Sequence, residues 1–478
     1  MLFNSFEFIF FFLPIVFFTW LFLRKYRFYR FAILSLLLFS LIFYAYWNPP
    51  FVLLLLFSII INFFIQKIIF HLQRLSYSKL SQCILTLGII FNISLIGYFK
   101  YKNFFLYNIN LFIGHSIPNT QMFLPLGISF FTFQQIACLV DTYKEKLKEI
   151  SFYKYALFVS FFPQLIAGPI VKYEEMIPQI QKSSTCRLIN FDMIHLGLSL
   201  FACGLFKKIV IADYFSPISI MLFDSHVLPT FYDSILGTLA YTMQIYFDFS
   251  GYSDMALGLG ALFGITLPQN FNSPYQSLSV IDFWRRWHIT LSKFLKDYIY
   301  IPLGGNRRSP LRKYFNLILT MLIGGLWHGA GWNFVIWGGL HGAYLVINNI
   351  YRIHNKFIKL PNIIYGVLTF SVVSFAWIFF RSPNFYRAYE IISALIVVRL
   401  HPFSLNAINL SNKEFNKFIL FLFVSIFISV FIPNIYNILS KKSCNRLSMA
   451  CIGGIALTIS LWLMTYTEKV SEFLYFQF

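Results

Sequence analysis

Runs of about twenty mostly apolar residues recur along the whole chain and limit the folds open to it. They cover 5–23, 31–47, 50–69, 82–98, 122–140, 153–171, 190–211, 232–249, 316–345, 362–380, 417–437 and 448–465. About twenty residues of α-helix cross the ~30 Å hydrocarbon core of a bilayer. Charged residues make up only 12% of the chain, against roughly 25% in a soluble domain. The sequence therefore predicts an all-α polytopic membrane protein with about eleven or twelve membrane helices, some of them re-entrant.

The chain is expected to form one integral domain, residues 1–478, whose middle differs from its ends. Residues 1–120 and 362–478 are plain hydrophobic runs, whereas Gly, Pro, His, Asp, Arg and Trp interrupt the runs between about 124 and 345. Polar and helix-breaking residues at membrane depth are tolerated only where they line a cavity or are buried in protein. We therefore expect the chemistry in 124–345 and a scaffold in the flanks.

Basic residues between the apolar runs predict the orientation of the chain. The cluster 24–30 follows the first run, and none precedes it, which indicates a permanent first span rather than a cleaved signal peptide. The positive-inside rule places this loop in the cytoplasm, together with 67–79, 144–154 and 282–313. The net charge of +20 then follows from loops that face anionic membrane lipids, and it needs no nucleic acid. A basic docking face for a phosphate-bearing donor or an acidic carrier protein is a compatible alternative.

Two histidines lie within the run 316–345, where an ionisable side chain is costly to bury and is a functional candidate. His328 lies in GLWHGAGW and His341 in WGGLHG. On one continuous helix they would be separated by about 20 Å and about 220° of rotation, so they could not share a substrate atom, although the glycines permit a break. We interpret His328 as a general base, with helix packing as the alternative, because burial favours the neutral, proton-accepting imidazole. For His341, packing or tunnel lining is the favoured interpretation.

The segment 283–292, FWRRWHITLS, combines two tryptophans, two arginines and a histidine. Trp284, Arg285 and Arg286 are typical of an interfacial helix whose rings lie at head-group level. That interpretation accounts less well for His288, which lies one helical turn after Trp284 and beside Trp287. His288 is therefore expected to face the cavity as a second polar residue, from its cytoplasmic mouth.

Two aspartates, Asp248 and Asp254, lie in YFDFSGYSD at the boundary of another run. Buried carboxylates are costly unless they are paired. Six residues apart, they would lie on different faces of one helix, which argues against a paired-carboxylate acid/base site. We expect Arg285, Arg286 or backbone amides as their partners, and a role in holding a catalytic histidine stays open.

Irregular backbone is expected at 162–170 and at 301–306, which ends in Gly304-Gly305-Asn306, because Pro removes an amide donor and Gly permits unusual dihedrals. These segments are surface loops, or they line a pore or funnel if they lie at membrane depth. No GxSxG, P-loop, GxGxxG or HExxH pattern occurs, which leaves serine hydrolases, NTPases, dinucleotide enzymes and zincins without support. The six cysteines lack metal-ligand spacing. Neither a metal nor a resident cofactor is predicted.

In this order, five of these segments resemble the membrane-bound O-acyltransferase (MBOAT) family, above all the bacterial proteins of alginate and peptidoglycan O-acetylation. They are SFFPQLIAGPI (160–170), YFDFSGYSD (246–254), DFWRRWH (282–288), YIPLGGN (300–306) and GLWHGA (325–330). The C-terminal FLYFQF (473–478) is also similar. The resemblance covers essentially the whole chain.

The resemblance implies a ring of helices around a tunnel that crosses the membrane, in the cytoplasmic (inner) membrane of a bacterium. His328 matches the family's catalytic histidine, and His288 matches its second tunnel position. The donor would be acetyl-CoA or another acyl thioester from the cytoplasm, and the acceptor an extracytoplasmic polysaccharide of the peptidoglycan or alginate type. A periplasmic partner with a serine-type (SGNH-like) transferase fold is also implied.

Acyl transfer from a thioester needs a base for the acceptor hydroxyl and donors for the tetrahedral oxyanion. His328 would be the base, and the sequence leaves His288, the Trp327 indole N–H and amides near Gly329 as candidate donors. The tunnel-lining or supporting candidates are Trp327, Asp248, Asp254, Arg285, Arg286, Trp287, Asn306 and His341. Two alternatives remain: transfer to a teichoic-acid or lipid hydroxyl, or a proton-coupled transporter or flippase with His328, Asp248 and Asp254 as relays.

Overall fold

The computed structural model describes residues 1–114, 123–186, 190–307, 309–354, 360–396, 405–441, 444–466 and 471–474. These residues form helices and loops without a strand, so the predicted all-α class is confirmed. The helices are α1 (Leu13–Lys25), α2 (Tyr29–Ala45), α3 (Pro49–Arg74), α4 (Ser78–Ile96), α5 (Lys102–Ile113), α6 (Ile128–Tyr143), α7 (Phe152–Ser160), α8 (Phe162–Leu165), α9 (Tyr173–Thr185), α10 (Phe191–Phe206), α11 (Asp213–Phe223), α12 (Phe231–Leu262), α13 (Val280–Arg286), α14 (Ile289–Leu295), α15 (Pro310–His328), α16 (Trp332–His354), α17 (Asn362–Arg381), α18 (Phe385–Ile396), α19 (Asn412–Phe431), α20 (Ile435–Leu439) and α21 (Arg446–Met464). The end of the similar C-terminal motif, 475–478, lies outside the described residues.

Within the described ranges, seven helical segments are long and apolar enough to cross a membrane, and the chain is a multi-pass membrane protein. They are Glu7–Lys25, Pro49–Arg74, Ser78–Ile113, Phe191–Phe223, Asn362–Arg381, Asn412–Phe431 and Arg446–Met464. Among the described residues, these candidate segments are fewer than the apolar runs, and two of the runs are broken. The run 153–171 breaks into α7 and the four-residue α8, as its Pro and Gly residues indicated, and 316–345 breaks into two helices.

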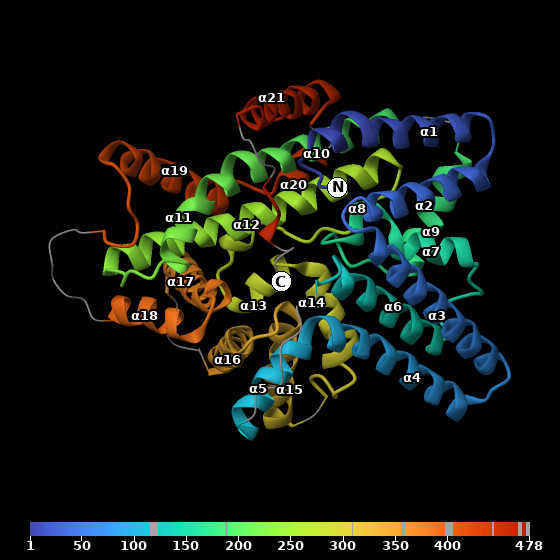
Figure 1. Cartoon of the computed structure of the whole chain (residues 1–478), viewed down its shortest axis with the longest axis horizontal. Helices are drawn as coiled ribbons and strands as arrows, with labels where there is room; N and C mark the ends of the chain where they lie inside the picture. Colours follow the sequence, from blue (N-terminus) through green and yellow to red (C-terminus); the bar gives the residue numbers. More distant parts are fainter. Residues whose placement is uncertain are drawn as a thin grey trace.

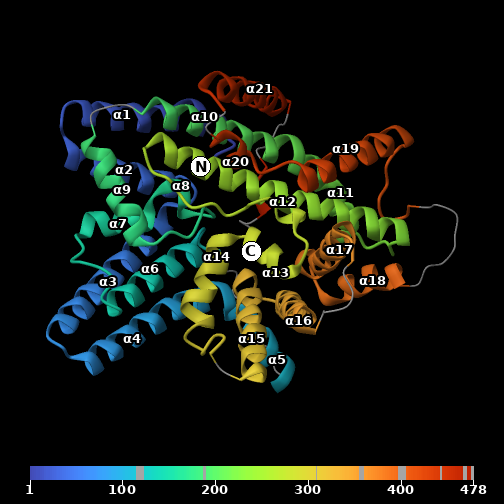
Figure 2. The same cartoon turned by 180° about the vertical axis from the view of Figure 1, so that it is seen from behind.

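Helix α12 runs through the middle of the molecule, with α1–α4 towards one end and α17–α19 towards the other (Figures 1 and 2). Nearly all of its residues from Gly237 onward are buried. Helix α10 lies directly against it because glycines face each other: a Cβ added at Gly204 would lie 2.5 Å from the Gly251 carbonyl oxygen. Small residues at such crossings let two backbones approach closely, which is how helices associate in lipid.

Buried ion pairs fix the same contact. After α10 the chain continues through a π-helical turn, η3 (Lys207–Ala212), whose lysines reach the aspartates of α12. Lys207 Nζ lies 2.6 Å from Asp254 Oδ2, and Lys208 Nζ lies 2.8 Å from Asp248 Oδ1. The Leu474 amide also donates to Asp248. The expected arginine partners of these aspartates were therefore wrong, whereas the expected backbone amide is present at Asp248.

The α15–α16 hairpin replaces the single helix considered for 316–345. Helix α15 ends at His328, and α16 begins at Trp332, so the break falls in the glycine-containing segment between them. The two helices touch at Gly325 and Gly338, where an added Cβ would lie 2.2 Å from the Phe334 oxygen or 2.4 Å from the Met321 oxygen. This close crossing sets the position of His328 relative to α16.

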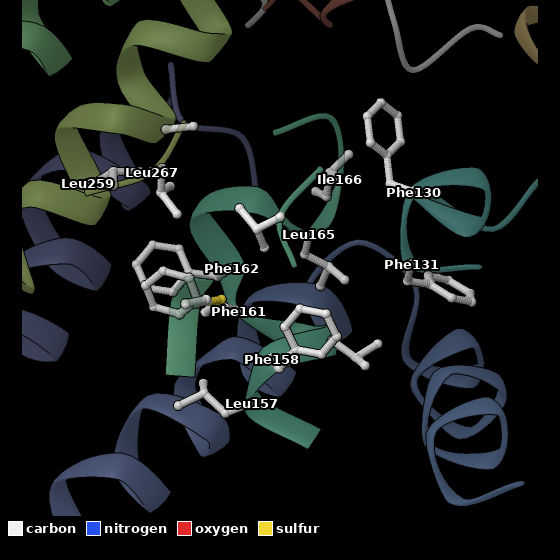
Figure 3. Packing of buried hydrophobic residues seen from close by; sticks show 14 of the residues in the cluster. Phe130, Phe131, Leu157, Phe158, Phe161, Phe162, Leu165, Ile166, Leu259 and Leu267 are labelled. Atoms are coloured by element: carbon white, nitrogen blue, oxygen red, sulfur yellow. The ribbon is translucent and has the colours of Figure 1, made fainter. Parts of the chain in front are cut away.

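Aromatic and aliphatic side chains fill the space between α6, α7 and α8. Figure 3 shows Phe158, Phe162 and Leu165 of α7 and α8 gathered in this core, with Phe130 and Phe131 on the neighbouring first turn of α6. Each of these four phenylalanines is at most 5% exposed. Burial of such rings is worth about 1.5–3 kcal/mol each in water, although in lipid tight packing replaces much of that driving force. The core holds the first turn of α6 next to the segment that follows α8.

Candidate active site

His328 is the last residue of α15, and it is 4% exposed. Its ring lies among aromatic rings from three helices. The ring centroids of Trp327, Trp337 and Phe380 are 4.9, 5.0 and 5.2 Å from that of His328. These side chains come from α15, α16 and α17, so the site includes a residue of the C-terminal flank.

His288 lies between α13 and α14, is fully buried, and has a φ of +41°, in the left-handed region. The expected continuous helix is therefore interrupted at the histidine itself. This conformation, which L-residues adopt at a cost, turns the chain so that the His288 ring centroid lies 6.5 Å from that of His328 and 4.9 Å from Phe249. The tertiary structure thus brings together the two histidines that the motifs singled out, although they are forty residues apart.

His341 lies closer to His328 than the single-helix interpretation allowed. Because the chain reverses between α15 and α16, both histidines pack against Trp337, with centroid distances of 5.0 and 4.8 Å. The expected separation along one helix was therefore wrong. Trp337 lies between the two rings, and the Trp284 indole N–H donates to His341 Nδ1 over 3.2 Å. His341 thus serves as a hydrogen-bonded neighbour of the aromatic cluster.

The other predicted supporting residues have contacts of their own. Trp284 is 9% exposed, so its ring is buried in protein and the interfacial interpretation was wrong for it; Trp287 is 2% exposed. Trp287 packs on the ring of Trp377 at 4.9 Å. Arg286 pairs with Asp282 at 2.9 Å, and Arg285 is exposed. Asn306 is also exposed, and it accepts a hydrogen bond from the Tyr300 hydroxyl.

Two residues that sequence reasoning missed hold the end of α15. Lys100 donates to the carbonyl oxygens of Trp327 and His328 at 2.6 and 2.9 Å, and Tyr101 donates to that of Leu326. The last carbonyls of a helix lack partners inside the helix. Both residues belong to a π-helical turn, η2 (Gly97–Tyr101), that follows α4. A lysine two residues after the apolar run 82–98 was the available signal. The flank 1–120 therefore contributes to the site.

A small pocket opens beside His328. It is lined by Lys100, residues 124–130, Ile166, Trp327 and His328. Its volume is about 20 Å³, which is room for about one water-sized group. We call it the histidine pocket. Its polar side chains come from η2 (Lys100), α6 (Ser129) and α15 (His328).

A second small pocket lies on the other side of an aromatic stack. Its volume is about 30 Å³, and Ala137, Lys172, Thr290, Lys293, Phe294 and Tyr298 are among its lining residues. We call it the lysine pocket. Phe133 stacks on Phe294 at 4.0 Å and on Trp327 at 5.3 Å. Since Phe294 lines the lysine pocket and Trp327 lines the histidine pocket, these three rings separate the two.

Outside the transmembrane helices, the lysine pocket carries a polar network. The Tyr298 hydroxyl donates to Asp141 at 2.7 Å, and Lys172 pairs with Asp297 at 3.0 Å. Burial, together with the nearby Asp141 carboxylate, raises the pKa of Tyr298 above its ordinary value, so this phenol stays protonated. Among the described residues, no group of three or more His, Cys, Asp or Glu side chains could hold a metal ion.

A buried histidine pair between two pockets, inside a bundle of membrane helices, is the kind of site expected of a membrane-embedded enzyme. Residues 74–388 match the model of the MBOAT, membrane-bound O-acyltransferase family, and the chain belongs to this family. It is accordingly an acyltransferase. The resemblance carried by the motifs is confirmed.

Named relatives agree with this assignment. The chain is 45% identical over 449 residues to a peptidoglycan O-acetyltransferase of Helicobacter pylori, covering 88% of this chain and 83% of that protein. It is 38% identical over 397 residues to a probable alginate O-acetylase AlgI of Pseudomonas aeruginosa, covering 82% and 75%. A teichoic acid D-alanyltransferase of Bacillus subtilis is 29% identical over 301 residues, covering 59% and 76%.

Proposed function

We propose that this acyltransferase O-acetylates an extracytoplasmic polysaccharide of the cell envelope from within the bacterial cytoplasmic membrane. The observation that carries the proposal is the His328–His288 pair, whose ring centroids are 6.5 Å apart. The histidine pocket and the lysine pocket lie near this pair. The similarity to enzymes named for acetylation of peptidoglycan and of alginate supports acetyl as the transferred group and a polysaccharide as the acceptor. The chain's higher identity to the former favours peptidoglycan.

The two substrates would reach the histidines from opposite sides of the membrane. The lysine pocket includes Lys293, within the segment 282–313 that the positive-inside rule places in the cytoplasm. Helix α6 runs from the histidine pocket, at residues 128–130, past Ala137 in the lysine pocket towards the basic loop 144–154. The thioester donor would therefore enter through the lysine pocket and the acceptor through the histidine pocket. Displacement of Phe133 from its stack would join the two pockets into a tunnel.

The chemistry assigned to the histidines follows from their surroundings. His328 is the general base that takes the proton of the acceptor hydroxyl, because a buried imidazole is favoured in its neutral form. His288 is the second polar group at the same carbonyl. The aromatic walls exclude water, which would otherwise hydrolyse the thioester.

The donor in this proposal is acetyl-CoA or another acetyl thioester, and the chain itself carries no cofactor. Lys293 of the lysine pocket suits a phosphate-bearing donor, since ammonium groups bind phosphate, whereas Lys172 is paired with Asp297. The acceptor hydroxyl belongs either to the polysaccharide or to a serine of a periplasmic SGNH-like transferase that completes the transfer. Membrane lipids surround the exposed apolar faces of the spanning helices.

Acyl transfer to a teichoic acid is the second candidate, favoured by the likeness to the D-alanyltransferase. That likeness covers 59% of the chain, against 88% for the peptidoglycan enzyme. A transporter or flippase loses its support, because the chain is a member of an acyltransferase family.

Complementation of a strain that lacks this gene tests the proposal. His328→Ala should insert normally and abolish envelope O-acetylation, measured as base-released acetate from purified polysaccharide. His288→Ala should lower it. His71→Ala is the matched control, because His71 is exposed at the end of α3. Wild-type O-acetylation in His328→Ala would contradict the catalytic assignment, and release of D-alanine in place of acetate would favour the second candidate.

A further inference from the structure

The first turn of α6 forms one wall of the histidine pocket. Gly127 precedes this helix with a φ of +70°, and an added Cβ there would lie 2.5 Å from the Leu165 carbonyl oxygen. Both facts require glycine at this position. The resulting turn places residues 127–130 along the pocket that contains His328.

Ser129, the second residue of α6, has unused hydrogen-bonding groups at this wall. It is 8% exposed and lines the pocket. In this first turn Ile128 bonds to the Pro125 oxygen, and Phe130 and Phe131 bond to the Gly127 oxygen. Within the described residues, neither the Ser129 amide nor its hydroxyl has a hydrogen-bond partner. Both groups of Ser129 are therefore available to a ligand in the pocket that it lines with His328.

The electrostatics of the pocket favour negative charge on such a ligand. The N-terminus of a sixteen-residue helix carries a partial positive charge, and its free amide is a donor for anions. The Lys100 ammonium lines the same pocket, where two carbonyls occupy two of its three N–H donors. In the low dielectric of a buried site these charges act strongly on a developing anion.

We propose that the hydroxyl and main-chain amide of Ser129 form the oxyanion site of the acyl transfer, opposite His328. This assignment rests on the proposed acyl transfer from a thioester. The acceptor oxygen bonds to the thioester carbonyl carbon while its proton passes to His328, and the π electrons move to the carbonyl oxygen. Ser129 donates both of its hydrogen bonds to that oxyanion. When the C=O bond re-forms, the C–S bond breaks, and the leaving thiolate takes the proton from His328.

The test compares Ser129→Ala with Thr132→Val in the purified, full-length protein, using acetyl-CoA as the donor and a soluble polysaccharide fragment as the acceptor. Thr132 is the matched control, because it is a buried hydroxyl of the same helix that donates to its own Ile128 carbonyl. Ser129→Ala should lower kcat by about 10²-fold with KM nearly unchanged, the cost of one oxyanion donor. Ser129→Cys keeps a weak donor of similar size and should retain more activity than the alanine variant.

Each outcome decides the assignment. A kcat of Ser129→Ala within about twofold of wild type overturns it, and so does a loss confined to KM or equal losses for Ser129→Ala and Ser129→Cys. If Ser129→Ala melts at a lower temperature than wild type, the comparison of its kcat with that of Ser129→Cys still tests the assignment. A packing role would not make activity follow the strength of the hydrogen-bond donor. If the wild-type gene does not restore envelope O-acetylation in the strain that lacks it, the proposed function fails as well. If only His328→Ala is inactive, the proposed function stands and the oxyanion site is wrong.

Discussion

A single methyl group at Gly338 should separate α15 from α16 and displace His328, the proposed general base. The Cβ of Gly338→Ala would lie 2.4 Å from the Met321 carbonyl oxygen and 3.2 Å from Gly325 Cα. Ordinary Cβ contacts begin near 3.4 Å, so the helices must move apart by about 1 Å. Such overpacking costs about 1–3 kcal/mol, and a 1 Å misplacement of reacting groups costs about 10²-fold in rate.

The adjacent glycine supplies the control. A Cβ at Gly339 meets only the flexible Leu322 side chain, at 3.6 Å. Both substitutions gain the same ~1 kcal/mol of helix propensity, so the difference between them isolates the crossing. We expect Gly338→Ala to melt at a lower temperature than Gly339→Ala in detergent and to lose about 10²-fold in O-acetylation rate, with Gly339→Ala close to wild type. Equal activities for the two variants would refute the argument that this crossing positions His328.

Three further predictions concern buried polar groups. Lys100→Met should lower O-acetylation strongly while the protein still inserts. Two carbonyls at the end of α15 would lose charge-assisted hydrogen bonds worth about 1.5–3 kcal/mol each. A fully active variant would show that these bonds are dispensable. Lys208→Met should destabilise the protein by about 3–5 kcal/mol, because it leaves the buried Asp248 carboxylate without its cation. Adding Asp248→Asn should restore part of the melting temperature, and no recovery would contradict the pairing. His341→Ala should lower the melting temperature through loss of the indole bond while it keeps transfer within a few-fold of wild type; inactivity without destabilisation would give His341 a chemical role.

Hydropathy and motif order determined the class of the protein. Runs of twenty apolar residues in a chain with few charges leave α-helices across a membrane as the available structure, because lipid offers backbone groups no partners. The motifs around His288 and His328 indicated the family and both histidines. The same local signals identified the interruption near Pro163 and allowed for a break at the glycines after His328.

Only the tertiary structure showed which residues far apart in the sequence form ion pairs and hydrogen bonds. Asp248 and Asp254 pair with Lys208 and Lys207, because η3 follows a glycine-packed helix crossing that sequence spacing does not reveal. The sequence did not single out Lys100, because the carbonyl oxygens to which it donates lie 227 and 228 residues away. Periodicity and propensity act within a few turns of chain, whereas helix crossings and chain reversals decide which buried groups meet. For that reason the sequence could indicate His328, but the structure was needed to surround it with Lys100, Ser129 and Trp337.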